Sequence, residues 1–251
     1  MGQVRIATSG WHYASWWGPF FSENIRTTDA LIYYASQFSA TELNAPFYRT
    51  PTVEAVRGWV EQTPNDFVFA WKASKFITHW KRLSERCENS IALLESRLNI
   101  LGRKAGPVLF QLPSQFEVNR ERLASFLKML PQRRRYVFEF RHPSWYDDAI
   151  LDLLRERDVA LCISDHHHAP APWEVTARAR LFAAARSGSP VPGQLPRRRV
   201  APVGTPHPPL ATRGPRRVLL FRQRSEEPAA ARCAAAGRTP GAERKRRCLG
   251  L

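Results

Sequence analysis

The first 177 residues of this 251-residue chain predict an α/β fold, a TIM-like (βα)8 barrel truncated to about six βα units. Short apolar runs alternate there with helical patterns, as they do in parallel sheets. Residues 108–110 and 160–163 are almost entirely apolar, which is typical of strands in a sheet covered on both faces. Beyond residue 177 the alternation stops and the composition changes.

Each element of this region can be placed from an apolar run or a helix-start residue. Strands are expected at residues 4–8, 40–43, 67–71, 108–111, 136–140 and 159–164. Helices are expected at about 29–38, 53–62, 83–101, 120–130 and 145–157. Thr28, Thr52 and Ser84 are residues that can cap the first three helices. The prolines of this region fall in the connections, where a missing N–H is harmless.

Two architectures fit such a series of βα units, the doubly wound open sheet and the closed barrel. An open sheet that binds nucleotides usually has a glycine-rich turn after its first strand. Here that turn reads Ser9-Gly10-Trp11-His12-Tyr13, with one glycine among bulky aromatic side chains. The barrel is therefore favoured.

Nearly all of the excess positive charge lies in the last 74 residues. Residues 1–177 contain 21 Lys and Arg against 19 Asp and Glu, whereas residues 178–251 contain 17 against 3. This tail is rich in Arg, Ala, Pro and Gly and has no Trp, Tyr, Ile, Met, Asn or Asp. We therefore expect a folded domain at 1–177 and a disordered basic tail at 178–251. Such a tail can bind nucleic acid without sequence specificity.

The remaining composition indicates a cytoplasmic protein without a membrane partner. The four cysteines lie far apart, match no metal-ligand spacing and suit reduced thiols. No apolar stretch is long enough to span a bilayer, and the first residues lack a basic-then-apolar signal pattern.

Polar side chains follow the ends of all six predicted strands, where parallel barrels have their active sites. Glu42 and Asn44 share one face of the second strand, and Glu139 and Arg141 share one face of the fifth. Other strand ends and the turns after them supply Trp11, Tyr48, Lys72, Gln111, His142 and Asp165. We expect these side chains to line one pocket. The competing interpretation is a purely structural ionic network, with Glu139 and Arg141 as one pair.

The predicted pocket combines carboxylates with cations. Glu139 and Glu42 are the candidate catalytic acid and base, because neighbouring cations can separate their pKa values. Arg141 and Lys72 are candidates for holding a phosphate or carboxylate. The other predicted substrate contacts are Asn44, Gln111, His142, Trp11, Tyr48 and Asp165. If the protein is an enzyme, the expected substrate is phosphorylated or sugar-like. If it is a non-catalytic binding protein, the expected ligand is a small anion or a nucleic acid.

Three further features have less specific interpretations. The run His166–His168 is not expected to bind a metal, because adjacent residues on an extended strand point apart, and no cofactor is predicted. Aromatic residues near the strand ends could stack on a sugar or base, although core packing is their commoner use. The run Arg133–Arg135 is expected to be a solvated loop.

Five segments, taken in order, resemble domain-of-unknown-function family 72. They are ATSGWHY at 7–13 with Trp16, ELN at 42–44 with FYR at 47–49, ITH at 77–79, GPVLFQLP at 106–113 and FEFRHPSW at 138–145. The resemblance covers residues 4 to about 177. It implies a TIM-like barrel of the bacterial or archaeal cytosol with no established reaction. Relatives carry Tyr-x-Arg-x-His-Gly on strand seven and Phe-(Asn/Asp)-Asn on strand eight, and this sequence has neither motif.

A shifted reading frame would explain the missing motifs. Read one base out of frame, codons 181–186 permit Tyr-Leu-Arg-x-His-Gly, and codons 217–221 permit Val-Tyr-Cys-Tyr-Phe before Asp-Asn-Asp. Two family motifs in order under one offset predict a frameshift near codon 177, which would also explain the Arg, Ala, Pro and Gly excess. Without strands seven and eight a barrel cannot close, and two strands keep bare edges. An inactive frameshifted product is therefore a third interpretation of this chain.

Overall fold

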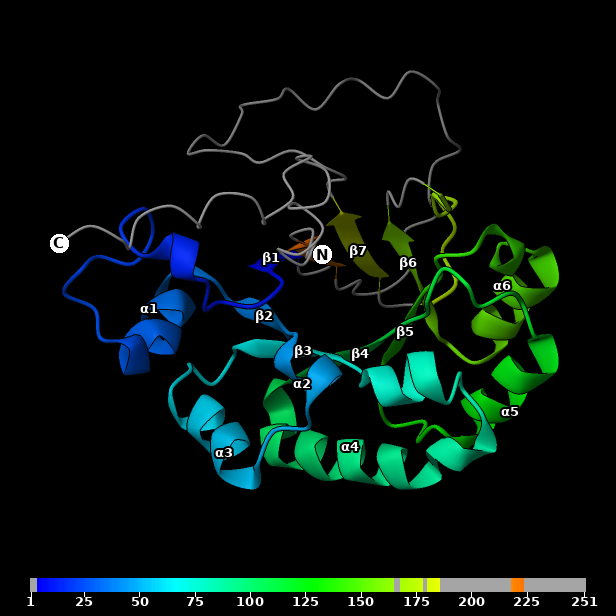
Figure 1. Cartoon of the computed structure of the whole chain (residues 1–251), viewed down its shortest axis with the longest axis horizontal. Coiled ribbons are helices and arrows are strands. Elements are labelled where there is room, and N and C mark those ends of the chain that lie inside the picture. The colour runs from blue at the N-terminus through cyan, green and yellow to red at the C-terminus, as the bar shows by residue number, and fades with distance from the viewer. Residues whose placement is uncertain (1–3, 165–167, 178–179, 186–217, 224–251) are drawn as a thin grey trace, which may run out of the picture.

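The computed structural model describes residues 4–164, 168–177, 180–185 and 218–223, and these form a TIM-like α/β barrel (Figure 1). Within them, eight parallel strands make one sheet in the order β1-β8-β7-β6-β5-β4-β3-β2. A parallel bridge between Ser9 and Glu42 joins the two ends of this order, and the Gly10 amide donates to the Glu42 carbonyl over 2.8 Å. The sheet therefore closes on itself, and the predicted barrel is confirmed.

The first six strands, and the helices between them, lie close to their predicted positions, and two further strands follow residue 177. The strands are β1 Val4–Thr8, β2 Ala40–Leu43, β3 Val68–Lys72, β4 Ala105–Gln111, β5 Tyr136–Glu139, β6 Ala160–Ser164, β7 Arg180–Ala185 and β8 Val218–Gln223. The helices are α1 Ala30–Gln37, α2 Ala45–Tyr48, α3 Val53–Glu61, α4 Glu88–Leu101, α5 Arg120–Met129 and α6 Asp148–Glu156, joined by short helical turns such as η3 Phe76–Trp80 and η6 Pro143–Trp145. Thr52 caps α3 as predicted, whereas Ser84 makes no cap hydrogen bond and precedes a 3-10 turn.

The structure differs from the predicted six-strand truncation by two strands, β7 and β8. Both lie in the region expected to be a disordered tail, at the segments where the shifted frame permits the two family motifs. β7 pairs with β6 and β8, and β8 pairs with β1. The short apolar runs LFAA and VLLF are enough to form these strands, because the backbone edges of β6 and β1 supply the hydrogen-bond partners. The rest of the predicted tail, at 178–179, 186–217 and 224–251, lies outside the described residues.

Side chains that alternate along the strands divide the core into two layers. The outward-facing residues, among them Phe69, Phe110 and Phe138, pack with the surrounding helices in one large buried cluster. The inward-facing residues fill the barrel and form a second cluster of Ala7, Ala40, Ala70, Leu109, Val137, Ala160 and Cys162. Side chains alternate with a period of two, so the residue two places after the last of these inward residues on each strand also faces inward. These next residues lie at the carboxyl ends of the strands, and we call this end of the barrel the mouth.

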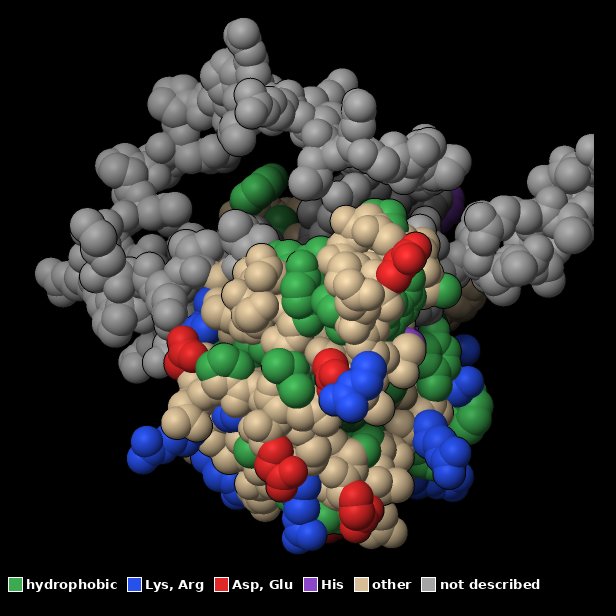
Figure 2. All heavy atoms as spheres, turned by 90° about the vertical axis from the view of Figure 1, so that its left-hand side faces the viewer, with side chains coloured by type: hydrophobic (Ala, Val, Ile, Leu, Met, Phe, Trp, Pro, Cys, Tyr) green, Lys and Arg blue, Asp and Glu red, His purple; other side chains and the backbone are tan. Residues whose placement is uncertain are grey.

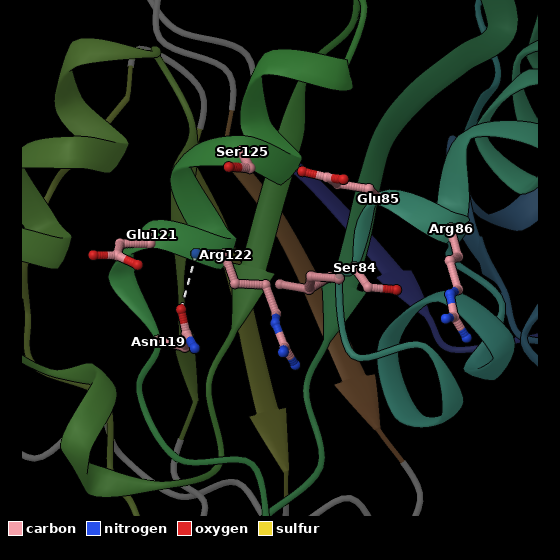
Figure 3. Close-up of a pocket in the computed structure, with 8 residues that line it drawn as sticks. Ser84, Glu85, Arg86, Asn119, Glu121, Arg122 and Ser125 are labelled. Atoms are coloured by element: carbon pink, nitrogen blue, oxygen red, sulfur yellow. Dashed lines mark hydrogen bonds between the residues drawn. The ribbon is translucent and has the colours of Figure 1, made fainter.

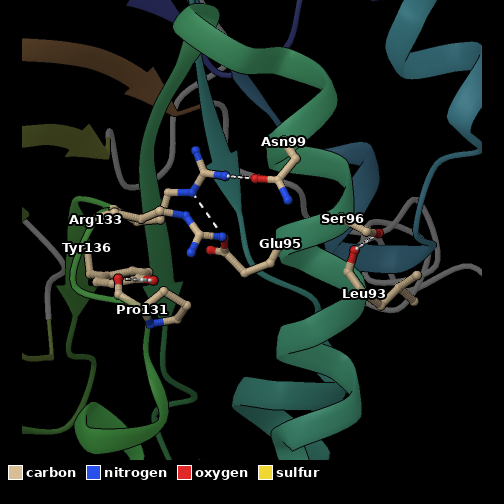
Figure 4. A network of polar contacts seen from close by, with 8 residues as sticks. Leu93, Glu95, Ser96, Asn99, Pro131, Arg133 and Tyr136 are labelled. Carbon is tan, nitrogen blue, oxygen red and sulfur yellow. Dashed lines mark hydrogen bonds and ion pairs between the residues drawn. The ribbon is translucent and has the colours of Figure 1, made fainter.

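The arginine run at 133–135 is solvated only in part, because Arg133 is exposed while Arg133 and Arg134 both bind α4. Arg133 Nη2 and Arg134 Nε both donate to Glu95 Oε2, over 2.7 and 3.1 Å, and Arg134 Nη2 donates to Asn99 Oδ1 over 2.6 Å (Figure 4). Glu95 is buried. Because a buried carboxylate needs a partner, this network ties the connection before β5 to α4.

The described surface carries charges of both signs. Lys and Arg side chains are interspersed with Asp and Glu on the face shown in Figure 2, as expected from the nearly balanced charge of residues 1–177. In the described part of the chain, no helix combines the length and apolar character needed to cross a bilayer. Cys87 and Cys162 are buried and belong to no disulfide among the described residues, and the other two cysteines lie outside those residues.

Candidate active site at the carboxyl ends of the strands

Each of the first six strands places a polar, inward-facing residue at its carboxyl end. In β1 this residue follows the last residue of the strand. These positions are Ser9, Glu42, Lys72, Gln111, Glu139 and Ser164. All are buried except Lys72, which is half-buried. The polar layer lies directly above the apolar interior of the barrel. These polar side chains therefore gather at the carboxyl ends of the strands, and a functional site there stays a prediction.

Both carboxylate oxygens of Glu139 have hydrogen-bond partners. Arg141 Nε donates to Oε1 and Gln111 Nε2 donates to Oε2, each over 2.8 Å. Burial alone would raise the pKa of Glu139, but the charge of Arg141, the hydrogen bonds from Gln111 and Arg141 and the charge of Lys72 together lower it below its ordinary value. Glu139 is thus held as an anion in a fixed orientation.

Glu42 has a different environment, although it is fully buried as well. Ser9 Oγ donates to Glu42 Oε1, and Asn44 Nδ2 donates to Ser9 Oγ over 2.8 Å. Burial raises the pKa of the Glu42 carboxyl against the opposing charge of Lys72 and the Ser9 hydrogen bond, and the charge of Glu139 raises it further. The two glutamates therefore have pKa values shifted in opposite directions, a pattern typical of acid–base pairs.

Three buried polar atoms at this mouth have no hydrogen-bond partner in the described structure, namely Glu42 Oε2, Asn44 Oδ1 and Ser164 Oγ. Leaving such an atom unsatisfied costs about 1–3 kcal/mol, so most buried polar atoms in proteins are paired. All three atoms, on β2, on β6 and in the turn after β2, are therefore available to a polar ligand or to water.

The cations of the mouth keep donors available. Arg141 uses Nε for Glu139, and its side chain is 26% exposed. Lys72 Nζ lies 4.7 Å from the centre of the Phe47 ring and makes no hydrogen bond or ion pair with another described residue. Both residues therefore keep N–H groups that no described residue occupies, and anion binding by them stays a prediction.

His79 follows the third predicted strand and is a further sequence candidate for holding the anion, and the structure brings it to this mouth. Its ring lies 5.2 Å from that of Phe47, and its Nδ1 is 2.8 Å from Thr78 Oγ1. Burial and neighbouring positive charges lower the pKa of His79 from 6.5 to about 4. These charges are those of Arg141, Lys72, Lys75 and Arg82. His79 is thus neutral near pH 7 and lies in a positively charged region.

The remaining predicted site residues have other contacts. His142 Nδ1 accepts from the Ser144 amide over 3.3 Å and lies 2.8 Å from Ser144 Oγ, so it caps η6. Trp11 is half-buried, with its ring edge-on to Trp59 at 5.8 Å. Tyr48 is 54% exposed at the rim. Asp165 lies outside the described residues. Substrate binding by these residues stays a prediction.

Two polar residues of the mouth, Ser9 and Ser164, are absent from the predicted set. Ser164 could have been found, because it follows Ala160 and Cys162 at intervals of two and therefore faces inward. The role of Ser9 depends on the bridge between β1 and β2, which joins segments 33 residues apart and leaves no local signal in the sequence.

Two other features, a possible metal cluster and a surface pocket, are candidates apart from this site. Over the described ranges, no three His, Cys, Asp or Glu side chains are arranged to hold a metal ion, and His168 is exposed while His166 and His167 lie outside those ranges. An open pocket of about 380 Å³ lies between the segment 83–86 and the start of α5 (Figure 3). It carries acidic and basic residues in equal number and includes none of the mouth residues.

The low pKa of His79 predicts a loss of stability at mildly acid pH. Between pH 6.5 and about 4 the unfolded chain protonates this ring while the folded protein does not, so stability falls as the pH falls through this range. Urea midpoints at pH 7 and pH 5 should therefore differ more for the parent than for His79→Gln. The carboxylates, which also titrate in this pH range, are the same in both proteins, so their contribution cancels in the comparison. Equal pH dependence in the two would contradict the assignment.

Comparison with known proteins gives one family. Residues 5–233 match the family model described as "Protein of unknown function DUF72", so the match continues beyond residue 177, where the sequence resemblance ended. UPF0759 protein YecE of Escherichia coli strain K12 is 33% identical over 114 residues, 45% of this chain and 42% of that protein. UPF0759 protein YunF of Bacillus subtilis is 31% identical over 121 residues, 45% of this chain and 43% of that protein. The chain thus matches less than half the length of these curated relatives.

Solved structures agree on the fold. A DUF72 family protein from Thermotoga maritima superposes with a TM-score of 0.62 at 25% identity, covering 72% of this chain and 74% of that one. A DUF72 family protein from Enterococcus faecalis gives 0.64 at 18% identity, covering 94% and 96%. The second likeness concerns the fold alone.

Proposed function

This chain belongs to the DUF72 family, and we propose that its barrel mouth binds a small phosphorylated, hydroxyl-bearing substrate on which Glu42 acts as the acid–base group. The observation that carries the proposal is the fully buried Glu42 carboxyl, which has one oxygen fixed by Ser9 and the other without a partner among the described residues. A catalytic carboxyl needs such a free oxygen in contact with the substrate.

The two glutamates have separate roles in this proposal. The raised pKa of Glu42 suits a group that gives a proton to the ligand atom it contacts or takes one from it. Glu139 is a poor candidate for that task, because both its oxygens are occupied and its pKa is lowered. We assign Glu139 as the positioning residue that holds Arg141 at the mouth. This modifies the sequence hypothesis, in which both glutamates are catalytic.

The charge and hydrogen-bonding capacity of the mouth support a phosphorylated ligand. Lys72 and Arg141 both have donors that no described residue uses, and the atoms of Glu42 and Asn44 without a described partner can pair with hydroxyl groups. A phosphate between the two cations would be charge-assisted, and Arg141 could bind it through two nitrogens.

Replacing Lys72 by Met is expected to weaken binding of inorganic phosphate and of ribose 5-phosphate at least about 10-fold, the loss of one charge-assisted contact. Isothermal titration calorimetry at low salt measures the effect. Lys128→Met, at an exposed position of α5, is the matched control and should leave both affinities unchanged. Phosphate affinity that is the same in both variants would count against the anion site.

Glu42→Gln separates an enzyme from a binding protein. For an enzyme, deuterium exchange from D2O into a phosphorylated sugar should require Glu42, while the Gln variant still binds that sugar. A non-catalytic anion-binding protein would bind the sugar equally well in both forms and show no exchange in either. Exchange that persists in Glu42→Gln would remove Glu42 from the acid–base role.

We also propose that the chain after about residue 177 arises from a shifted reading frame. The support is positional, since β7 and β8 occupy the two segments whose offset codons permit the family motifs. The nucleotide sequence across codons 165–190 tests this. An extra or missing base that disappears on resequencing would restore both motifs, whereas a real shift would make this chain an inactive relative. Codons that cannot encode the motifs in the offset frame would refute the proposal.

A further inference from the structure

An exposed group of side chains beside the mouth, Tyr48, Lys75 and Trp80, forms what we call the aromatic ledge. We propose that this ledge stacks the base of a nucleotide whose phosphate is held by Lys72 and Arg141. The inference rests on the proposed function and specifies its substrate class.

The ledge exposes two large rings on either side of one ammonium group. Tyr48 is 54% exposed and Trp80 is 66% exposed. Lys75 Nζ lies 5.6 Å from the centre of the Tyr48 ring and 5.2 Å from that of Trp80. Aromatic faces with a neighbouring cation are the arrangement on which proteins stack nucleobases.

The ledge is continuous with the mouth through Phe47. The Phe47 ring lies 5.0 Å from that of Tyr48, perpendicular to it, and 4.7 Å from Lys72 Nζ. His79, next to Trp80 in the chain, touches the same Phe47 ring at 5.2 Å. A ligand with its anionic group at Lys72 can therefore extend over Phe47 toward the exposed rings.

The backbone of the ledge has an uncommon form. The turn η3, Phe76–Trp80, is π-helical, and the Lys81 amide donates to the Phe76 carbonyl over 2.8 Å. π-Helical turns are rare and frequently occur at functional sites. This turn brings His79 against Phe47 while Trp80 remains beside Lys75.

The parts of a nucleotide match the parts of the site. The cations suit its phosphate, the unpartnered atoms of Glu42 and Asn44 suit its ribose hydroxyls, and the ledge suits its base. A plain sugar phosphate would leave the exposed rings uncovered, and an uncharged aromatic ligand would leave the cations of the mouth without a partner. A mononucleotide satisfies all three groups at once.

The test compares AMP with ribose 5-phosphate on the full chain by calorimetry. AMP should bind about 5- to 100-fold more tightly, the contribution expected of one stacked base. Trp80→Ala should remove most of this advantage and leave ribose 5-phosphate binding unchanged. Trp173→Ala, which removes a different tryptophan that is 76% exposed, is the matched control and should change neither affinity. Lys75→Met provides a second variant of the ledge.

The outcomes separate the two proposals. If AMP and ribose 5-phosphate bind equally, Trp80→Ala has no effect and Lys72→Met weakens both, the ledge is not a base-stacking surface and the anion site stands. If neither ligand binds, or if Lys72→Met changes neither affinity, both proposals are overturned.

Discussion

Replacing Glu139 by alanine is expected to lower the free energy of unfolding at pH 7 by about 3 kcal/mol, because it leaves Arg141 and Gln111 without their shared buried partner. Glu139 itself is 1% exposed, so its hydrogen bonds to Arg141 and Gln111 are shielded from water. Guanidinium denaturation measures the change, and an unchanged denaturant dependence would show that the unfolded state is not altered. Glu139→Gln keeps one acceptor oxygen and should cost less.

The matched control removes an exposed partner of another arginine. Asp152→Ala in α6 breaks the ion pair between Asp152 and Arg155, whose side chains are 64% and 39% exposed, respectively. This substitution should lower the free energy of unfolding by no more than about 1 kcal/mol. The Glu139 effect should also shrink below the ordinary carboxyl pKa of 4.5, because a lowered folded pKa gives stability that is lost as the pH falls through it. Similar losses in Glu139→Ala and Asp152→Ala would show that Glu139 does not hold Arg141.

The separation of the two glutamates could not be predicted from the sequence, although the presence of both could. Alternation along β2 and β5 places Glu42 and Glu139 in one mouth from the pattern alone. Which oxygen remains free depends on contacts between distant segments, such as Gln111 with Glu139 and Ser9 with Glu42. Such pairs carry no periodic signal, so only the folded barrel distinguishes an anchoring carboxylate from a free one.

The same reason explains the two strands that the sequence did not predict. β7 and β8 contain apolar runs, LFAAA and VLLF, but these runs stand within a tail rich in Arg, Ala, Pro and Gly that predicts no regular structure. Their position follows from the closure of the barrel, since β6 and β1 each offer an edge that a parallel strand can pair with. The π-helical turn η3 is similar, because FITHW has no pattern that separates it from an ordinary helical turn.

Replacing Trp145 by alanine is expected to lower the free energy of unfolding by about 3–5 kcal/mol, a large part of the 5–15 kcal/mol that usually stabilises a domain. Trp145 is fully buried and stacks on Phe140 with ring centres 4.9 Å apart and planes within 6°. Its Nε1–H donates to the Phe116 carbonyl over 2.6 Å, so the variant leaves both a cavity and an unpaired carbonyl. Trp173→Ala, at an exposed position, should change stability by no more than about 0.5 kcal/mol.

The Trp145 substitution also tests how the mouth is held. Trp145 ends the turn η6, which begins just after Arg141 and His142, so its packing fixes the segment that carries the arginine. Trp145→Phe keeps a ring against Phe140 but loses the hydrogen bond to Phe116, and should cost about 1–3 kcal/mol. If Trp145→Phe folds with unchanged phosphate affinity, the ring alone positions Arg141. A weaker affinity in that folded variant would show that the hydrogen bond from Trp145 positions the arginine as well.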